Sequence, residues 1–208
     1  MLISFEGPEG SGKSTQINLL SNYLEAQNIN YICIREPGGT LLSEEIREIL
    51  KSDLYSDLSK ESELLLFLAS RSQLVNQIIK PSLLKNKFVL CDRYIDSTLA
   101  YQGYGRQISL KNIELLNNFT TGGLEPNITF LLQLDVHNSL ERINKRYKET
   151  SSTLDRIEKE EKFFHQRVHD GYNEIAKNNK RVIKINAMQS IDVISKKIQM
   201  EVDKYRNN

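Results

Sequence analysis

Residues 7–14 read GPEGSGKS, and they carry the clearest chemical signal in the chain. They match the pattern G-x-x-x-x-G-K-[ST] at every fixed position, which is the P-loop that cradles nucleotide phosphates. Its glycines allow a tight turn whose N–H groups point at one phosphate, and the expected helix adds its positive dipole. Lys13 is predicted to reach the β- and γ-phosphates, and Ser14 to offer its hydroxyl to Mg²⁺. The residues expected to bind ATP are Gly7, Pro8, Glu9, Gly10, Ser11, Gly12, Lys13, Ser14 and Thr15.

A P-loop indicates a nucleotide but not a reaction, because GTPases, motors, transporters and kinases share it. A GTPase should also carry an N-K-x-D motif that reads the base. Here Asn144 and Lys145 are followed by Arg146 and Tyr147, so the aspartate is missing. This absence weakens the GTPase interpretation.

Two aspartates follow apolar runs, Asp92 after FVLC and Asp135 after FLLQL. Either could hold Mg²⁺ through water. We favour Asp92 because Arg93 follows it, and charged residues at the carboxyl ends of parallel strands lie where open α/β sheets bind ligands. The alternative for the Asp-Arg pair is a surface ion pair at a strand end.

The elements that must position these residues alternate along the chain. Apolar runs at 2–5, 31–34, 88–91, 128–134 and 182–185 predict five strands buried on both faces. Helical spacing covers 13–26, 61–80, 109–119, 136–147, 158–177 and 190–205, with Pro81 expected to end the second of these helices. Strands separated by helices predict a three-layer α/β fold, a five-stranded parallel sheet with helices on both faces. The polar segment 148–155 is the best candidate for a mobile loop.

Length and composition favour one globular domain over residues 1–208. The net charge of +1 gives no broad field for nucleic acid or a membrane surface. Cys33 and Cys91 lie in apolar runs, so we expect buried free thiols. The amino terminus shows no secretory signal, and no apolar run approaches 18 residues, which predicts a cytoplasmic protein.

Four segments together resemble the bacterial thymidylate kinases. They are EGPEGSGKST from Glu6, REPGGT from Arg35, CDRYIDSTLAYQGYGR from Cys91, and LDRIE from Leu154, in the order typical of that family. The resemblance runs from residue 2 to about residue 190. It implies a P-loop kinase fold, ATP and dTMP as substrates, Mg²⁺ as cofactor, and a homodimer.

The resemblance also assigns residues to the second substrate. Arg93 resembles the arginine that bridges the dTMP phosphate and the γ-phosphate, and Arg47 resembles one that holds the dTMP phosphate. Arg71 and Phe67, four residues apart on one helix face, resemble the residues that contact the thymine ring. The complete expected set is Glu9, Glu36, Pro37, Arg47, Phe67, Arg71, Arg93, Thr98, Tyr101 and Gln102. By themselves, Phe67 is typical of core and Arg47 of a solvated helix.

The segment 144–158 is expected to form a lid. The variable positions of the P-loop hold no basic residue, and in such members of the family a lid arginine stabilises the transferred charge. Arg156 is the first candidate, Arg146 the second and Arg142 the third. Lys13, Arg93 and Arg156 are therefore the predicted catalytic residues, with no general base, because a phosphate oxygen of dTMP is already anionic.

Two other functions remain open at this point. One is a related kinase acting on another nucleoside monophosphate or on a deoxynucleoside. The other is a non-catalytic P-loop module that binds ATP and signals by changing conformation. The arginines Arg71 and Arg93, placed for a second anionic substrate, argue against the second alternative.

Overall fold

The computed structural model describes residues 1–150 and 154–206, and its centre is a five-stranded sheet. The strands are β1 (Leu2–Glu6), β2 (Tyr31–Arg35), β3 (Phe88–Asp92), β4 (Ile128–Gln133) and β5 (Val182–Asn186). They lie in the order β2-β3-β1-β4-β5, and every neighbouring pair is parallel. The predicted parallel sheet is confirmed. None of the described helices carries an apolar stretch long enough to cross a bilayer.

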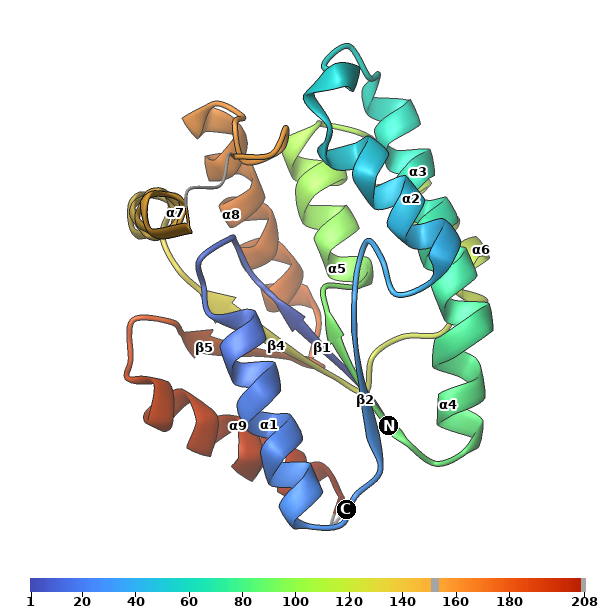
Figure 1. Ribbon diagram of the computed structural model, residues 1–208, viewed down its shortest axis with the longest axis vertical. Helices are drawn as coiled ribbons and strands as arrows, with labels where there is room; N and C mark the ends of the chain where they lie inside the picture. The colour runs from blue at the N-terminus through green and yellow to red at the C-terminus, as the bar shows by residue number, and fades with distance from the viewer. Residues whose placement is uncertain (151–153, 207–208) are drawn as a thin grey trace.

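Helices cover both faces of this sheet, as expected (Figure 1). On one face lie α1 (Lys13–Ala26) and α9 (Ile191–Arg206), whose buried side chains pack with Phe5, Leu90 and Phe130 in the largest core cluster. On the other face, the end of α3 (Lys60–Leu74) and the π-helical turn η2 (Val75–Ile79) pack on Val89 and Cys91. The alternating side chains of the central strands therefore point into two apolar layers.

The outer strands correct one prediction. Both β2 and β5 are only partly buried, because each lies at an edge of the sheet and has one neighbour. Cys33 on β2 is exposed, whereas Cys91 on the central strand β3 is buried, and both thiols are free. Burial on both faces holds for the three central strands alone.

Proline does not end the second helical run, contrary to the prediction. After η2 the chain continues as α4 (Lys80–Leu84), with Pro81 in its first turn, where the missing N–H group costs little. The segment after β3 was not predicted as helix. It forms α5 (Ile95–Thr98) and then η3 (Leu99–Gly105), a second π-helical stretch.

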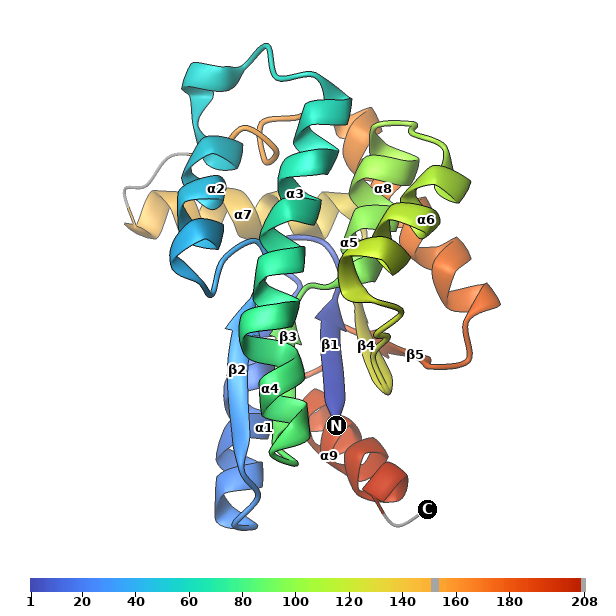
Figure 2. The same ribbon diagram turned by 90° about the vertical axis from the view of Figure 1, so that its right-hand side faces the viewer.

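The remaining helices surround the carboxyl ends of the strands. They are α2 (Leu41–Lys51), the short turn η1 (Asp53–Tyr55), α6 (Leu110–Thr121), α7 (Val136–Thr150) and α8 (Lys162–Asn178). In Figure 2, α7 crosses behind α2 and α3 above the strand ends. The first residues of the predicted loop 148–155 thus belong to α7, and residues 151–153 lie outside the described part of the chain. The helix expected from residue 158 begins at Lys162.

Candidate active site

The loop between β1 and α1 has the geometry that its sequence predicts. Gly7 has φ 133°, and a Cβ atom there would lie 2.4 Å from the carbonyl oxygen of Leu132, so only glycine fits. Gly12 takes the left-handed conformation at the N-cap of α1. Lys13 is buried, and its ammonium group donates to the carbonyl oxygens of Gly7 (3.2 Å) and Pro8 (3.0 Å). Burial, followed by the charge of Arg93, lowers the pKa of Lys13. The loop therefore holds a cation at its centre.

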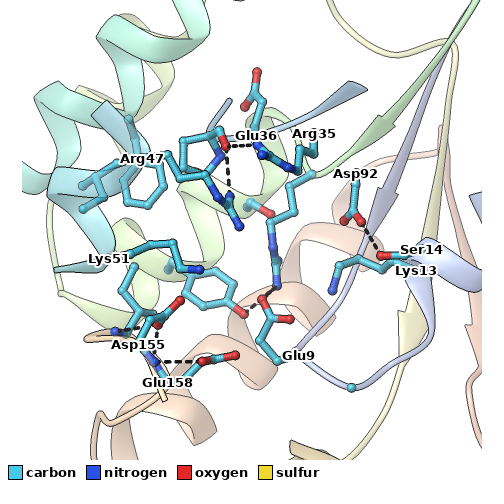
Figure 3. Close-up of a pocket in the computed structure, with 18 of the residues that line it drawn as sticks. Glu9, Lys13, Ser14, Arg35, Glu36, Arg47, Lys51, Asp92, Asp155 and Glu158 are labelled. Atoms are coloured by element: carbon cyan, nitrogen blue, oxygen red, sulfur yellow. Dashed lines mark hydrogen bonds and ion pairs between the residues drawn. The ribbon is translucent and has the colours of Figure 1, made fainter. Parts of the chain in front are cut away.

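Ser14 and Asp92 meet at the start of α1. The Ser14 hydroxyl donates to Asp92 Oδ2 at 2.8 Å, which joins the P-loop to the end of β3 (Figure 3). A hydroxyl and a carboxylate are hard oxygen ligands of the kind that Mg²⁺ prefers. The other candidate, Asp135, instead caps α7 through the N–H of Asn138 at 2.9 Å. The donor set thus fits a magnesium ion at the start of α1.

One cavity of about 630 Å³ opens over the P-loop and extends towards α2 and α3. All ten residues predicted for the second substrate line it, together with Ser14 and Asp92. Of the residues predicted for ATP, six line the cavity, whereas Gly7, Pro8 and Ser11 belong to the loop but not to the lining. The lining residues of the predicted second-substrate set are Glu9, Glu36, Pro37, Arg47, Phe67, Arg71, Arg93, Thr98, Tyr101 and Gln102.

Arg93 lies between the part of this cavity over the P-loop and the part lined by α2, α3 and η3. Its guanidinium group donates to the Gly7 carbonyl (3.1 Å), to Glu9 (2.6 Å) and to the hydroxyl of Tyr101 (3.2 Å). Glu9 keeps a lowered pKa, because the charges of Arg93 and Lys13 outweigh the effect of burial. Burial raises the pKa of Tyr101 to about 12, so that phenol stays neutral. A fixed cation thus touches both the P-loop and the pocket beyond it.

Behind Arg93 lies a carboxylate that sequence reasoning did not single out. Glu6, at the end of β1, is fully buried and accepts from the Ser97 hydroxyl (2.5 Å) and from the Tyr172 hydroxyl (3.0 Å). The same two hydroxyls each accept from Arg93 Nη1 at 3.2 Å. Burial, and then the charge of Asp96, raises the pKa of Glu6 to about 7. Tyr172 comes from α8, far along the chain, and no sequence pattern marks it.

Arg71 is the most deeply enclosed cation of the site, with 2% of its surface exposed. Its Nε and Nη2 atoms donate to Glu36 at 2.8 Å and 2.6 Å. Nη1 donates to Thr98 and to Asn117, both at 2.7 Å, and Nη2 also reaches the Tyr94 carbonyl at 3.0 Å. These contacts use every N–H donor of the guanidinium group, so Arg71 can present its flat face to a ring. Glu36 Oε1, in contrast, is buried with no partner among the described residues.

Two arginines meet at the rim of the cavity. Arg47 Nη1 and Arg35 Nη1 both donate to the carbonyl of Pro37, at 2.9 Å and 3.1 Å (Figure 3). Burial, with the charge of Arg35, lowers the pKa of Arg47. Lys51 lines the same wall from the next turn of α2. Like charges held this close favour an anionic ligand between them. Arg35 stands in the quoted segment REPGGT, but sequence reasoning gave it no role.

The segment expected to be a lid contributes Arg146, Tyr147, Asp155, Ile157 and Glu158 to the lining. Arg146 donates to Glu158 at 2.8 Å. Arg156, the first candidate for a catalytic lid arginine, is outside the lining. It donates instead to buried Glu63 at 2.7 Å and to the Leu50 carbonyl at 3.3 Å. The structure thus places Arg146, and not Arg156, in the lining of the cavity. The third candidate, Arg142, donates to the carbonyls of Gly10 (3.2 Å) and Ala187 (3.3 Å).

Comparison with known proteins agrees with this geometry. Residues 5–198 match the family model described as thymidylate kinase. A thymidylate kinase of Kosmotoga olearia is 46% identical over 97% of this chain and 94% of its own length. One of Staphylococcus epidermidis is 44% identical over 98% of this chain and 97% of its own length. The crystal structure of a thymidylate kinase from Ehrlichia chaffeensis superposes with a TM-score of 0.76 at 38% identity, covering 97% of this chain and 98% of that one.

Proposed function

Because the chain belongs to the thymidylate kinase family, we propose that the two halves of its cavity divide the two substrates between them. The enzyme is an ATP-dependent kinase that phosphorylates dTMP to give dTDP and ADP. In our proposal, the P-loop half holds the triphosphate of ATP and the half lined by α2, α3 and η3 holds dTMP. The alternatives of another acceptor and of a non-catalytic module are not favoured by the relatives.

The observation that carries this assignment is the position of Arg93. Its guanidinium group bonds a P-loop carbonyl and Glu9 on one side, and lies 5.0 Å from the ring centre of Tyr101 on the other. A cation at this point can touch the phosphate of dTMP and the γ-phosphate together. It would then offset charge that builds up between the two during transfer.

Transfer needs alignment more than it needs proton chemistry. A phosphate oxygen of dTMP forms a bond to the γ-phosphorus, while the bond from that phosphorus to the β–γ bridging oxygen breaks and ADP leaves with the electron pair. Arg47 and Arg35 would hold the dTMP phosphate at the rim, and Lys13 and Arg93 would hold the transferred group. Holding both substrates in line removes much of the entropy cost of bringing them together.

We propose that Mg²⁺ binds through Ser14, with Asp92 holding it through water. Their oxygens are 2.8 Å apart and lie beside Lys13. When bound, the ion would neutralise charge on the β- and γ-phosphates.

The base is proposed to lie between Phe67 and the layer that contains Arg71 and Tyr101. Phe67 and Arg71 share one face of α3 and both line the cavity. Tyr101 closes the floor beneath the sugar, where a 2′-hydroxyl would meet a packed aromatic ring. Thr98 and Gln102 follow on α5 and η3 and present polar groups to the base edge.

We propose a single kinase domain over 1–208, with 144–158 as its lid and Arg146 as the lid cation nearest the reaction. Its position in the lining supports this choice over Arg156. A lid at this place would exclude water, which otherwise competes for the γ-phosphoryl group. The loop 148–155, which was expected to be mobile, includes residues 151–153, and these lie outside the described part of the chain.

A cytoplasmic homodimer is proposed from the resemblance. Exposed Leu65 on α3 and exposed Leu115 and Phe119 on α6 support an apolar contact surface, since these two helices pack together. Sedimentation of the native enzyme and of Phe119→Lys would test it. A monomer in both cases would contradict the proposal.

A substrate panel tests the assignment of the second substrate directly. ADP release with ATP and Mg²⁺ should be fastest with dTMP, and slower with dUMP, dCMP, UMP or thymidine. Arg47→Ala should raise KM for every monophosphate while leaving KM for ATP near its native value. Equal weakening of both substrates would contradict the proposed division of the cavity.

A further inference from the structure

A buried carboxylate joins the lid to the base half of the cavity. Glu63, in the first turn of α3, has 1% of its surface exposed. It accepts four hydrogen bonds, from Gln102 Nε2 (2.9 Å), Arg106 Nε (3.1 Å), Arg106 Nη2 (2.9 Å) and Arg156 Nη2 (2.7 Å). Neither the resemblance nor the sequence assigned it a role.

The two oxygens of Glu63 accept hydrogen bonds from different parts of the molecule. Oε1 accepts from Gln102, which lines the cavity, whereas Oε2 accepts from Arg156, which belongs to the lid segment. Arg106 bonds both oxygens and so fixes the plane of the carboxylate. Burial alone would raise the pKa of Glu63, but hydrogen bonds and charge from Arg106, with help from Gln102 and Arg156, leave that pKa lowered. Glu63 is therefore ionised at neutral pH.

An ionised carboxylate accepts hydrogen bonds and cannot donate them. The amide of Gln102 must therefore turn its NH₂ group to Glu63, as the 2.9 Å bond from Nε2 to Oε1 shows. Its carbonyl oxygen is then the polar end left for the cavity. A carbonyl oxygen can accept from the N3–H of thymine or uracil, but it opposes the N3 lone pair of cytosine.

We propose that Glu63 is a positioning residue that selects the base through Oε1, by fixing the Gln102 amide, and holds the lid through Oε2, by binding Arg156. This inference rests on the proposed base site. It adds that Glu63, which is outside the cavity lining, sets the discrimination between thymine and cytosine. It also gives Arg156 a role in lid position instead of direct contact with the phosphate.

The variant Glu63→Gln tests the first part. Its carbonyl oxygen should take the place of Oε2, where Arg106 Nη2 and Arg156 Nη2 donate, so its NH₂ group should face Gln102 and turn that amide over. The ratio of kcat/KM for dTMP to that for dCMP should then fall by at least about tenfold. The ratio for dTMP to dUMP should change by less than about twofold, because both bases carry N3–H. An unchanged dTMP-to-dCMP ratio would overturn the proposal.

Three further variants separate the two proposed roles of Glu63, fixing Gln102 and binding Arg156. Arg156→Ala should lower kcat and raise ATP hydrolysis without acceptor, while keeping the dTMP-to-dCMP ratio; a changed ratio would contradict the division between the two oxygens. Glu63→Asp keeps an acceptor-only group, so its base preference should survive even where kcat falls, and it carries the test where Glu63→Gln melts below the assay temperature. Loss of that preference would overturn the proposal. Glu61→Gln, an exposed carboxylate on the same helix, is the matched control and should change neither quantity.

The variant Gln102→Ala distinguishes an error in the proposed base site from an error in the role of Glu63. If Gln102→Ala leaves kcat/KM for dTMP and dCMP unchanged, then Gln102 does not read the base and the proposed base site is wrong there. If Gln102→Ala changes the preference while Glu63→Gln does not, the base site stands and the role of Glu63 is refuted.

Discussion

The two halves of the cavity are built in different ways. The P-loop half comes from one continuous stretch of eight residues, and its key groups are backbone N–H and C=O groups fixed by glycine conformations. The half proposed for dTMP, here called the acceptor half, is assembled from side chains on α2, α3, α5 and η3. Buried ion pairs fix these side chains, and the pair Arg71–Glu36 joins residues 35 positions apart in the sequence. In our proposal, phosphate binding is thus a local property of the chain, whereas dTMP binding depends on the whole fold.

The largest effect should come from the local half. Lys13→Ala removes the ammonium group that the P-loop encloses, and turnover should fall by about a thousandfold or more. ADP release at saturating ATP and dTMP measures it. Lys180→Ala, an exposed lysine before β5, is the control and should keep native turnover. Near-native activity of Lys13→Ala would contradict the proposed triphosphate site.

Arg93 belongs to both halves, so its removal tests whether they act together. Arg93→Ala should lower kcat by about a hundredfold or more, because the contact matters most while charge moves between the phosphates. Arg93→Lys should recover only part of this loss, since an ammonium group cannot reproduce contacts to Gly7, Glu9 and Tyr101. Steady-state kinetics with both substrates give the measurement. A change restricted to KM would remove the transition-state role.

The acceptor half should depend on its buried ion pairs for stability as well as for binding. Glu36→Gln leaves the Arg71 charge buried without its counter-ion, and unfolding free energy should fall by about 3 kcal/mol. KM for dTMP should rise. The matched variant Glu44→Gln breaks the exposed pair with Arg35 and should cost about 1 kcal/mol or less. Denaturant titration compares the two, and equal losses would show that burial does not distinguish these pairs.

The last effect concerns the pH dependence of stability and comes from Glu6, whose partners Ser97 and Tyr172 also bond Arg93. Its pKa is raised from 4.5 to about 7, so the folded state holds this proton more tightly than the unfolded state. The stabilisation from the proton is complete below pH 4.5 and is lost as pH rises through about 7, up to about 3 kcal/mol. Glu6→Gln cannot titrate there. The free energy of unfolding of Glu6→Gln, relative to that of the native chain, should therefore increase between pH 4.5 and about 7. Parallel curves of unfolding free energy against pH would contradict the raised pKa of Glu6.

The sequence predicted the local half almost completely. The strand, loop and helix around the P-loop appear where the glycine pattern places them, and the two residues assigned to the metal ion, Ser14 and Asp92, are hydrogen-bonded to each other. The five strands were also predictable, because their apolar runs are short and distinct. Their burial was less so, since an apolar run does not reveal whether a strand such as β2 lies at the edge.

The acceptor half was predicted mainly through the resemblance. No spacing rule could show that Glu63 binds both Gln102 and Arg156, or that Tyr172 reaches Glu6 and Arg93. These contacts join segments that approach each other only after folding. The π-helical segment η3 was missed for a related reason, because its wider turn follows neither of the two common periodicities.

Arg93 also adopts φ 73°, a left-handed conformation that a non-glycine residue holds at a cost of about 1–2 kcal/mol. Glycine at this position would relax the main chain. In the native chain the ion pair with Glu9 and the bonds to Gly7 and Tyr101 offset this strain. Arg93→Gly and Arg93→Ala lose these bonds alike, but only alanine keeps the strained main chain. Of the two inactive variants, Arg93→Gly should therefore melt at the higher temperature.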